Sequence, residues 1–459
     1  MTSLASRFRN SSTLKLITIL FITLTMTIPV SMVESTIHER TGLKHHAETS
    51  ISARWGGEQH ISAPVLVVPY REKIVENTVG NNGWHTREPV PEKRIRYVDH
   101  VAYMLADKVH ISSVMATETR YFGIYEMPVY TSRTRILGHY SKDDLNKLED
   151  KYPNIEWTKA RLVLPVEDVR GIREISELTI ADKKLDFIPS THGDSQLPGV
   201  EAAIELDNPG QNNLSFSLEI NLSGSKQLNY LPLARTSLIT LESDWSSPSF
   251  TGSYLPIERN IDASGFQAEW KILGLNRSFG QNWRDNNVDE KQIKTAAFGI
   301  SLYQPADLYQ QNTRSVKYAV LFIALTFMAF FLFEIFYGLR LHPVQYFFTG
   351  GALSTFYLLL LALSEHINFS IAYLISSISI TILMSGYSMA ILKQRSRGLL
   401  VGIMTAIIYS FLFFLVQSEQ NSLLFGSIGF FAALSLMMYL TRNIDWYQLK
   451  SGTTDAAES

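Results

Sequence analysis

The stretch YAVLFIALTFMAFFLFEIFYGL, residues 318–339, contains a single charged side chain, Glu334. A helix that crosses a bilayer needs about 20 mostly apolar residues, because lipid cannot satisfy its backbone polar groups. Similar apolar stretches occupy residues 14–33, 344–364, 370–392, 399–416 and 423–440. The sequence therefore predicts six membrane spans, of which the last five form a C-terminal bundle.

Charged residues gather between the first and the second predicted span. The chain has 459 residues and a net charge of −2, and residues 34–316 alone hold 31 basic and 37 acidic side chains. Residues 317–440 hold only eight charged side chains. A nucleic-acid-binding protein needs a basic surface, so this acidic balance argues against a nucleic-acid partner. The chain has no cysteine, which excludes a disulfide scaffold.

Basic residues mark alternate ends of the predicted spans. Lys and Arg in short loops are retained on the cytoplasmic side of a membrane. They stand before the first span, in the loops from span 2 to 3 and from span 4 to 5, and after the sixth span: Arg7, Arg9, Arg340, Lys393, Arg395, Arg397 and Arg442. The loops 365–369 and 417–422 contain none. We therefore expect both termini in the cytoplasm.

The predicted domain order follows from these spans. It comprises an N-terminal tail, the first span, an external domain, spans 2 to 6 and a C-terminal tail: residues 1–13, 14–33, 34–315, 316–440 and 441–459. The first span has the position and basic flank of a cleaved signal peptide. Its long apolar run and the lack of an Ala-x-Ala site in residues 29–35 favour a retained anchor instead. Residues 34–53 lack proline, so we expect the helix to continue beyond the membrane.

The external domain shows the residue pattern of β-strands. In LSFSLEINL, residues 214–222, apolar and polar side chains alternate strictly, as in a strand with one face on a core and one in water. Similar alternation occurs in residues 162–166, 266–272 and 298–302. One-sided strands are typical of antiparallel sheets. The predicted fold class is an α+β membrane protein, with a large, mainly antiparallel β domain inserted between the first span and the five-helix bundle.

One helix is predicted within this domain, at residues 141–152. Ser141 stands three residues before Asp144, a capping-box-like start in which the serine side chain accepts from first-turn amides. Pro153 ends the pattern, because proline cannot continue a helix.

Glu334 is the most informative ionisable residue of the predicted spans. A carboxylate inside a membrane span is costly and often marks a proton or ion pathway. Glu334 lies about 9 Å of helix rise from Arg340 at the cytoplasmic end of its span. At that depth it could equally bond a neighbouring helix or reach the membrane surface. We favour a structural role and keep transport as the alternative.

Four further residues are candidates for function. His342 at the inner turn and the pair Glu365 and His366 at the outer turn lie at opposite ends of the third span, roughly 30 Å apart by helix rise. That separation argues against one catalytic centre. Trp55 precedes two glycines, so it either ends a helix and joins a core or lies at the lipid surface, and we favour the first interpretation.

The sequence contains no strong motif for catalysis, a metal or a cofactor. His45 and His46 are adjacent and would point to different sides of a helix, so they cannot share one ion. No H-E-x-x-H, G-x-S-x-G, P-loop or G-x-G-x-x-G pattern occurs. We therefore expect a protein that is not an enzyme and has neither a cofactor nor a metal site.

Several segments resemble the CreD inner-membrane protein family. They include RWGGEQ at 54–59, APVLVVPY at 63–70, DVRGI at 168–172 and, in the membrane part, LHPVQY at 341–346. The resemblance extends in order over about residues 34–390. It departs from the family pattern at Ala63 and Asn368, where glycine is usual.

The resemblance implies an inner-membrane protein of Gram-negative bacteria that is linked to cell-envelope integrity. It also implies expression under the Cre two-component system in some members and altered tolerance to certain colicins. It brings no established enzymatic activity and no catalytic residues.

Three functional hypotheses remain. The leading one is a non-enzymatic envelope protein that contacts the lipid bilayer and binds a periplasmic partner or envelope component through its external domain. The second is a proton-coupled transporter or flippase that uses Glu334. The third is a metal-dependent envelope hydrolase.

Overall fold

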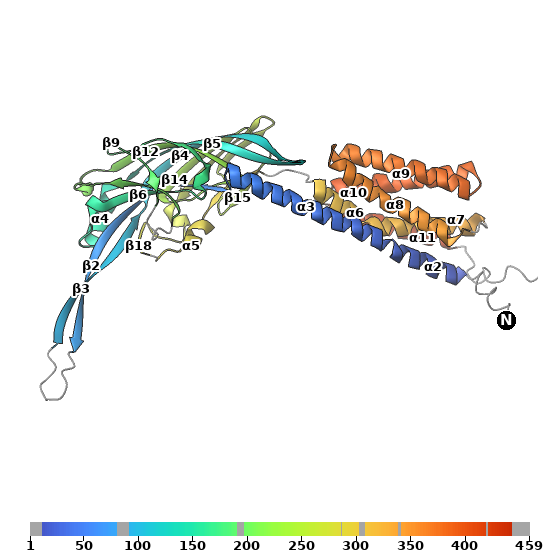
Figure 1. Ribbon diagram of the computed structural model, residues 1–459, viewed down its shortest axis with the longest axis horizontal. Coiled ribbons are helices and arrows are strands. Elements are labelled where there is room, and N and C mark those ends of the chain that lie inside the picture. The colour runs from blue at the N-terminus through green and yellow to red at the C-terminus, as the bar shows by residue number, and fades with distance from the viewer. Residues whose placement is uncertain are drawn as a thin grey trace, which may run out of the picture. The chain divides into compact units, whose positions relative to one another are not determined.

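The computed structural model describes residues 12–79, 91–190, 197–285, 287–302, 308–337, 341–418 and 421–442 (Figure 1). It divides into two compact units, which we call the helical unit, Met1–His45 with Ala306–Ser459, and the β unit, His46–Pro305. Most of both predicted terminal tails lies outside the described residues. The mixed α and β content and the large antiparallel-rich β domain agree with the predicted fold class.

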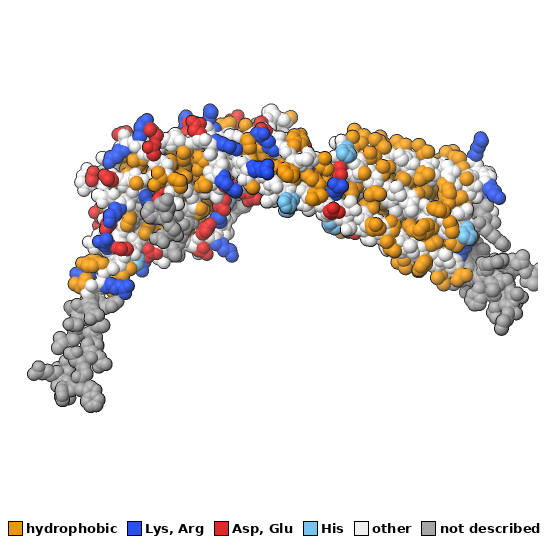
Figure 2. All heavy atoms as spheres, viewed as in Figure 1, with side chains coloured by type: hydrophobic (Ala, Val, Ile, Leu, Met, Phe, Trp, Pro, Cys, Tyr) orange, Lys and Arg blue, Asp and Glu red, His pale blue; other side chains and the backbone are white. Residues whose placement is uncertain are grey.

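The helical unit contains helices that match all six predicted spans in length and composition. The first runs through Leu14–Trp55 and consists of α2 (Ser12–Thr25) and α3 (Thr27–Trp55), whose last residues belong to the β unit. The others are α7 (Ala319–Tyr337), α8 (Pro343–Ser364), α9 (Phe369–Ile391), α10 (Arg395–Gln417) and α11 (Ser422–Thr441). A short helix, α6 (Leu308–Lys317), precedes α7. Hydrophobic side chains cover much of the helical unit's visible surface (Figure 2), as expected for contact with lipid.

Small residues and aromatic rings hold the helices of this unit together. A Cβ on Gly350 of α8 would lie 2.7 Å from the Met26 side chain and 2.8 Å from that of Phe327, so glycine lets these helices approach closely. Between α8 and α10, the rings of Phe356 and Tyr409 are 4.3 Å apart. The Tyr373 hydroxyl donates to the backbone oxygen of Tyr409 at 2.7 Å, which joins α9 to α10.

The described residues of the β unit form three sheets. The four-stranded sheet has the order β1, β13, β19, β15: Gln59–Ile61, Gln227–Tyr230, Phe298–Leu302 and Pro248–Gly252. The six-stranded sheet has the order β10, β11, β6, β2, β3, β18: Ile188–Pro189, Gly199–Ile204, Ala160–Pro165, Val65–Val79, Pro91–Met104 and Asn282–Arg284.

The largest sheet has the order β16, β17, β14, β4, β5, β12, β8, β9, with β7 also paired to β12. Its strands are Glu258–Asp262, Gly265–Leu273, Ala234–Ser243, Ala106–Phe122, Tyr125–Tyr140, Leu214–Ser225, Leu178–Ile180, Lys183–Leu185 and Ile172–Ile175. Among the described strands, the parallel pairs are β1 with β13 and β4 with β14. The predicted strands at 162–166, 214–222, 266–272 and 298–302 are found as β6, β12, β17 and β19.

The three sheets share one hydrophobic core. Buried side chains from all of them form a single cluster, in which Trp270 of β17 is fully buried. The Trp270 ring lies 6.3 Å from the ring of Tyr230 and 5.9 Å from that of Phe298, both on the four-stranded sheet. The apolar sides of β12, β17 and β19 face this core, which is why the period-two pattern identified these strands. The prediction of a one-sided strand at 162–166 was wrong, because Val163 of β6 is buried in a second cluster on the other face of the sheet.

The predicted helix at 141–152 is α4 (Lys142–Lys151), but it begins differently from the expectation. Ser141 is the N-cap, yet its side chain accepts no first-turn hydrogen bond. Asn213 supplies one such acceptor instead, because its Oδ1 accepts from the Lys142 amide at 3.0 Å. Asp144 is turned into the structure, where Arg235 donates to its carboxylate. A tertiary contact has therefore replaced the local cap.

Candidate functional site

Glu334, the acid inside the second span, has three partners in the helical unit. Lys15 of α2 donates through Nζ to Oε1 of Glu334. The backbone amide of Leu341 also donates to Oε1, at 3.2 Å, and the Tyr346 hydroxyl of α8 donates to Oε2 at 3.4 Å. The Glu334 side chain is buried, and a buried carboxylate is costly unless it is paired and hydrogen-bonded. These contacts account for its burial and join α2, α7 and α8.

Glu365 at the C-terminal end of α8 has a similar arrangement. Arg40 of α3 places Nε 3.6 Å from Oε1 of Glu365, and the Tyr309 hydroxyl of α6 donates to the same oxygen at 3.1 Å. One residue earlier, the Ser364 hydroxyl accepts from Asn312 Nδ2 of α6 at 2.9 Å. Polar contacts therefore hold α3, α6 and α8 together at this level.

The two carboxylates do not form one site. Glu334 contacts Lys15, and Glu365 contacts Arg40, about 25 residues further along the first helix. At 1.5 Å per residue that is about 37 Å of helix. The first helix is thus bound to the helical unit by two separated ion pairs, which we call the Lys15 ion pair and the Arg40 ion pair.

The two candidate histidines are exposed at the ends of α8. His342 is the N-cap of this helix: its Nδ1 accepts from the Val344 amide at 3.3 Å, and its own amide donates to Oε1 of Gln345 at 3.0 Å. His366 follows the C-terminal end, where its amide donates to the backbone oxygen of Leu363. Within the described residues, no group of three or more His, Asp or Glu side chains is arranged to hold a metal ion.

Trp55 is the last residue of α3 and is bound within the β unit. Its ring lies between two guanidinium groups, 4.3 Å from Arg120 and 4.6 Å from Arg173, which are cation–π distances. Its Nε1 donates to the backbone oxygen of Tyr130 at 3.2 Å. Trp55 also packs against Ile51 and its neighbours on β5. These contacts favour the structural interpretation of Trp55 over a lipid-surface anchor.

The residues after Trp55 explain why the segment RWGGEQ needs its first glycine. Gly56 has φ 128°, and a Cβ there would lie 2.5 Å from the Ser223 backbone oxygen, so only glycine fits without strain.

Asp168 contacts the residues that follow Gly56. The Gly57 amide donates to Oδ2 of Asp168 at 3.0 Å, and Nε2 of the buried Gln59 donates to the Asp168 backbone oxygen at 3.0 Å. Hydrogen bonding by Arg170 lowers the pKa of Asp168. Two segments far apart in the sequence therefore meet at the end of the first helix.

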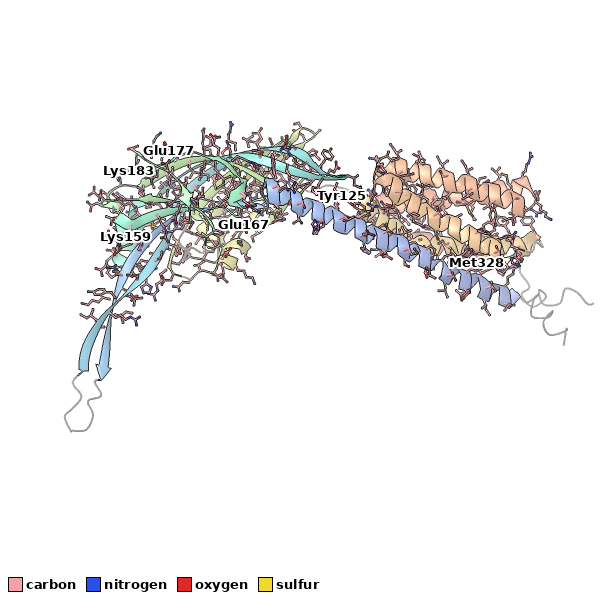
Figure 3. All side chains as sticks on the ribbon, in the orientation of Figure 1. Tyr125, Lys159, Glu167, Glu177, Lys183 and Met328 are labelled. Atoms are coloured by element: carbon pink, nitrogen blue, oxygen red, sulfur yellow. The ribbon has the colours of Figure 1, made fainter. Side chains whose placement is uncertain are left out.

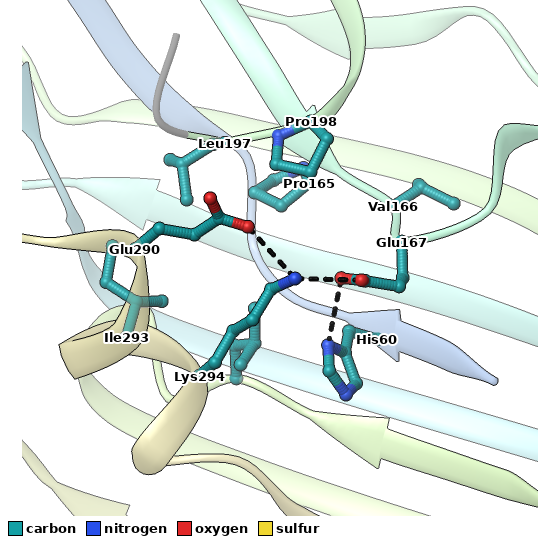
Figure 4. Close-up of a pocket in the computed structure, with 10 residues that line it drawn as sticks. His60, Pro165, Val166, Glu167, Leu197, Pro198, Glu290, Ile293 and Lys294 are labelled. Carbon is teal, nitrogen blue, oxygen red and sulfur yellow. Dashed lines mark hydrogen bonds and ion pairs between the residues drawn. The ribbon is translucent and has the colours of Figure 1, made fainter.

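Sequence reasoning missed a polar pocket in the β unit (Figure 4). His60 of β1 places Nδ1 3.3 Å from Oε2 of Glu167, which follows β6. Lys294 of α5 (Glu290–Thr295) places Nζ 2.8 Å from Oε1 of Glu167 and 2.9 Å from Oε1 of Glu290. Burial lowers the pKa of His60. Apolar residues complete the lining: Pro165, Val166, Leu197, Pro198, Leu231 and Ile293.

This pocket combines a neutral imidazole with a lysine between two carboxylates. The lysine charge is matched by Glu167 and Glu290, so the groups suit polar recognition better than activation of a nucleophile. Glu290 and Lys294 are four residues apart on one helix, a spacing that the sequence does show. His60 and Glu167 come from distant segments, and no spacing could have indicated that they meet.

A match to a protein-family model extends over residues 11–447, and that family is described as inner membrane protein CreD. The chain belongs to the CreD family. It is 33% identical over 424 residues to "Inner membrane protein CreD" of Escherichia coli (strain K12), covering 92% of this chain and 91% of that protein. With six helices among its described residues that are long and apolar enough to span a membrane, it is a multi-pass inner-membrane protein embedded in the lipid bilayer.

Similarity to solved structures adds nothing to this assignment. One match is a provisionally named protease from Parabacteroides distasonis ATCC 8503, at 7% identity and a TM-score of 0.23, covering 50% of each chain. Likeness at that level supports no statement on fold or function.

Proposed function

We propose that this CreD-family protein supports cell-envelope integrity without catalysing a reaction. In this proposal the β unit lies in the periplasm and binds a protein or another envelope component. The first helix connects that unit to the membrane bundle. Tolerance to envelope stress, including certain colicins, depends on the connection.

The observation that carries the proposal is the set of contacts along Leu14–Trp55. Lys15 pairs with the buried Glu334 and Arg40 with the partly buried Glu365 of the helical unit, whereas Trp55 is held between Arg120 and Arg173 in the β unit. A helix bound at both ends by side-chain contacts can transmit a displacement or a binding event along its length. Lys15 and Glu334 lie within predicted spans, where a charged side chain is costly, so their pairing points to selection for this contact.

The proposed topology follows from charge. Residues 1–13 and 441–459 are cytoplasmic, 14–33 is the first span, 34–315 is periplasmic and 316–440 contains the remaining spans. Support comes from the basic residues that flank α8 and α10 on one side and from their absence in the alternate loops of the sequence.

The pocket at His60 is the proposed contact point for the partner. It offers hydrogen-bond donors and acceptors from His60, Glu167 and Lys294 beside an apolar lining, which is the composition of sites that orient a polar group. Because Glu290 stands at its edge, a photo-crosslinking side chain at that position can report on an occupant.

In-cell photo-crosslinking tests this function. A benzophenone amino acid replaces Glu290 in the full chain, and a matched control replaces Leu275, which is 94% exposed on the same unit. We expect a defined adduct at position 290 that is absent at position 275. We also expect the variant at position 290 to fail to restore stress tolerance in cells that lack the wild-type chain. Equal labelling at both positions would contradict the pocket assignment. Turnover of a lipid, glycan or peptide by the purified full chain would contradict the non-enzymatic role.

A further inference from the structure

The segments around the pocket at His60 are fixed by contacts within the β unit. Val166 forms a β-bridge with Ile61, and its amide donates to the Pro198 backbone oxygen at 3.0 Å. Ile293 of α5 is buried in a hydrophobic cluster, which anchors that helix. The pocket is therefore formed before any occupant arrives, and its charged groups are held at defined positions.

Negative charge exceeds positive charge in this pocket. Among the described residues that line it, the charged side chains are Glu167, Glu290 and Lys294, which leaves a net charge of −1. His60 does not offset this charge, because burial lowers the pKa of His60 from its ordinary value of 6.5 and keeps the ring neutral at pH 7. Glu58, two positions before His60, adds a third carboxylate near the ring. A positively charged occupant is thus favoured over an anion.

The two carboxylates that line the pocket keep acceptor capacity beyond the contact with Lys294. Lys294 Nζ lies 2.8 Å from Oε1 of Glu167 and 2.9 Å from Oε1 of Glu290. Oε2 of Glu167 lies 3.3 Å from Nδ1 of His60, whereas Oε2 of Glu290 has no hydrogen-bond partner among the described residues. The side chains of Glu167, Lys294 and Glu290 are 33%, 36% and 46% exposed, so an occupant can reach them. Figure 4 shows the two carboxylates on opposite sides of the ammonium, and Figure 3 shows Glu167 in the β unit.

Apolar side chains form the rest of the pocket wall. They come from two prolines and four aliphatic residues: Pro165, Val166, Leu197, Pro198, Leu231 and Ile293. The pocket holds about 260 Å³ of empty space, part of which is open to solvent. Pockets for drug-sized ligands have about 300–1,000 Å³, so this one suits the end of a single side chain. An aliphatic stem can pack on the apolar wall while a charged head stays at the polar rim.

We propose that the pocket at His60 binds an aliphatic cation, an ammonium or guanidinium group on a hydrocarbon stem, as in a lysine or arginine side chain of a protein partner. The inference rests on the proposed function, because it names the chemistry of the group that the pocket receives there. The cationic head binds the carboxylates of Glu167 and Glu290, and the stem packs on the apolar wall. Lys294 contacts the same carboxylates, so it competes with the incoming cation.

Saturation-transfer NMR of the full chain in phosphatidylcholine nanodiscs tests this proposal. The probe is N-acetyl-lysine methylamide, and N-acetyl-glutamate methylamide is its anionic counterpart. Phosphatidylcholine has no net charge, so the lipid does not collect the cationic probe. The signal of each probe is compared between wild type, Glu290→Gln and Lys294→Met. Glu258→Gln is the matched control, because it makes the same acid-to-amide change on β16, which contributes none of the described lining residues.

We expect the lysine probe to give a several-fold larger signal than the glutamate probe with the wild-type chain. Glu290→Gln should lower the lysine-probe signal several-fold, whereas Glu258→Gln should leave it unchanged. Lys294→Met should raise the signal, because it removes the competing cation, and a misfolded variant cannot produce such a gain. Equal signals from the two probes, a signal that Glu290→Gln leaves unchanged, or a loss in a stably folded Lys294→Met would each overturn the proposal.

Glycerophosphoethanolamine separates a lipid headgroup from a protein side chain as the source of the cation. Only two carbons connect its ammonium to the phosphate oxygen, so little apolar stem can pack on the wall of the pocket. We expect a smaller signal from it than from the lysine probe. An equal or larger signal would overturn the assignment to a side chain.

The binding test and the photo-crosslinking test can fail separately. A defined crosslink at position 290 without binding of the lysine probe would contradict this inference and leave the proposed function standing. Binding of the lysine probe without any crosslink in cells would contradict the proposed function and support the cation specificity of the pocket.

Discussion

Lys15 of α2 and Glu334 of α7 form an ion pair between residues that lie 319 positions apart in the chain. The pair places a lysine from the first span against the acid of the second span. Glu334 also accepts from the Leu341 amide and the Tyr346 hydroxyl, so both of its oxygens are used. An acid with this set of partners is first of all a contact between helices.

Substitution of Glu334 separates a structural role from transport. Glu334→Gln keeps an acceptor for Leu341, whereas Glu334→Ala leaves the Leu341 amide and the Tyr346 hydroxyl without their acceptor. We expect alanine to lower the free energy of unfolding by about 1–3 kcal/mol, and glutamine to cost less. Protein abundance and tolerance to envelope stress should fall in the same order. If glutamine abolishes function as fully as alanine at normal abundance, proton chemistry at Glu334 is favoured instead.

Disruption of the Arg40 ion pair should have a smaller effect. Arg40 is partly exposed and its Nε is 3.6 Å from the carboxylate, so Arg40→Ala should cost about 0.5–1 kcal/mol. Glu365→Ala also removes the acceptor of the Tyr309 hydroxyl and should cost more, whereas Glu365→Gln keeps that acceptor. Thermal unfolding of the full chain in nanodiscs measures the series. A larger loss for Arg40→Ala than for Glu365→Ala would be inconsistent with the observed contacts.

Trp55 substitutions test the contact between α3 and the β unit. Trp55→Phe keeps a ring between Arg120 and Arg173 but loses the hydrogen bond to Tyr130, at a cost of about 0.5–1.5 kcal/mol. Trp55→Ala should lower the free energy of unfolding by at most about 3–5 kcal/mol, because the ring is only partly buried. Trp157→Phe is the matched control, because its buried Nε1 has no hydrogen-bond partner. We expect it to cost less than Trp55→Phe in the same unfolding assay.

His60 gives the β unit a dependence on pH. Burial lowers the pKa of folded His60 below its ordinary value of 6.5, so the unfolded chain binds the proton more readily. The contribution of neutral His60 to stability is complete above about pH 6.5 and is lost as the pH falls through the folded pKa. The difference in unfolding midpoint between wild type and His60→Asn should therefore shrink on acidification. A difference that grows as the pH falls would contradict a lowered pKa.

Reporter fusions test the proposed topology. Val33 lies inside a helix that continues to Trp55, so the first fusion belongs after Gly57 rather than at the end of the predicted span. Reporters should be external, internal, external, internal, external and internal at Gly57, Arg340, Phe369, Arg397, Asn421 and Ser459. Any other order would contradict the proposed topology, in which the chain has six spans and both termini are cytoplasmic.

Local patterns in the sequence predicted much of the fold. Alternation in residues 214–222 identified β12, because its apolar face packs on the core of the β unit. The absence of proline after the first span correctly predicted that the helix continues, and it ends at Trp55 before Gly56. The Ser141 cap was wrong because Asn213, which follows η3 (Pro209–Gln211), supplies the acceptor.

Local patterns in the sequence could not predict which residues contact the candidate residues. Glu334 was selected by the cost of a charge in a span, but its partner Lys15 belongs to another span. No local pattern marks His60 as a site residue, because its neighbours Glu167 and Lys294 come from other parts of the chain. Only tertiary structure brings such residues together.

A double-mutant cycle on the Lys15 ion pair tests most directly whether the first helix is bound to the bundle as described. Lys15→Met, Glu334→Gln and the double variant are compared by unfolding of the full chain in nanodiscs. We expect a coupling free energy of about 1–3 kcal/mol, so that the double variant is little less stable than either single variant. Additive losses, with a coupling free energy near zero, would show that Lys15 and Glu334 do not stabilise each other and would contradict the account.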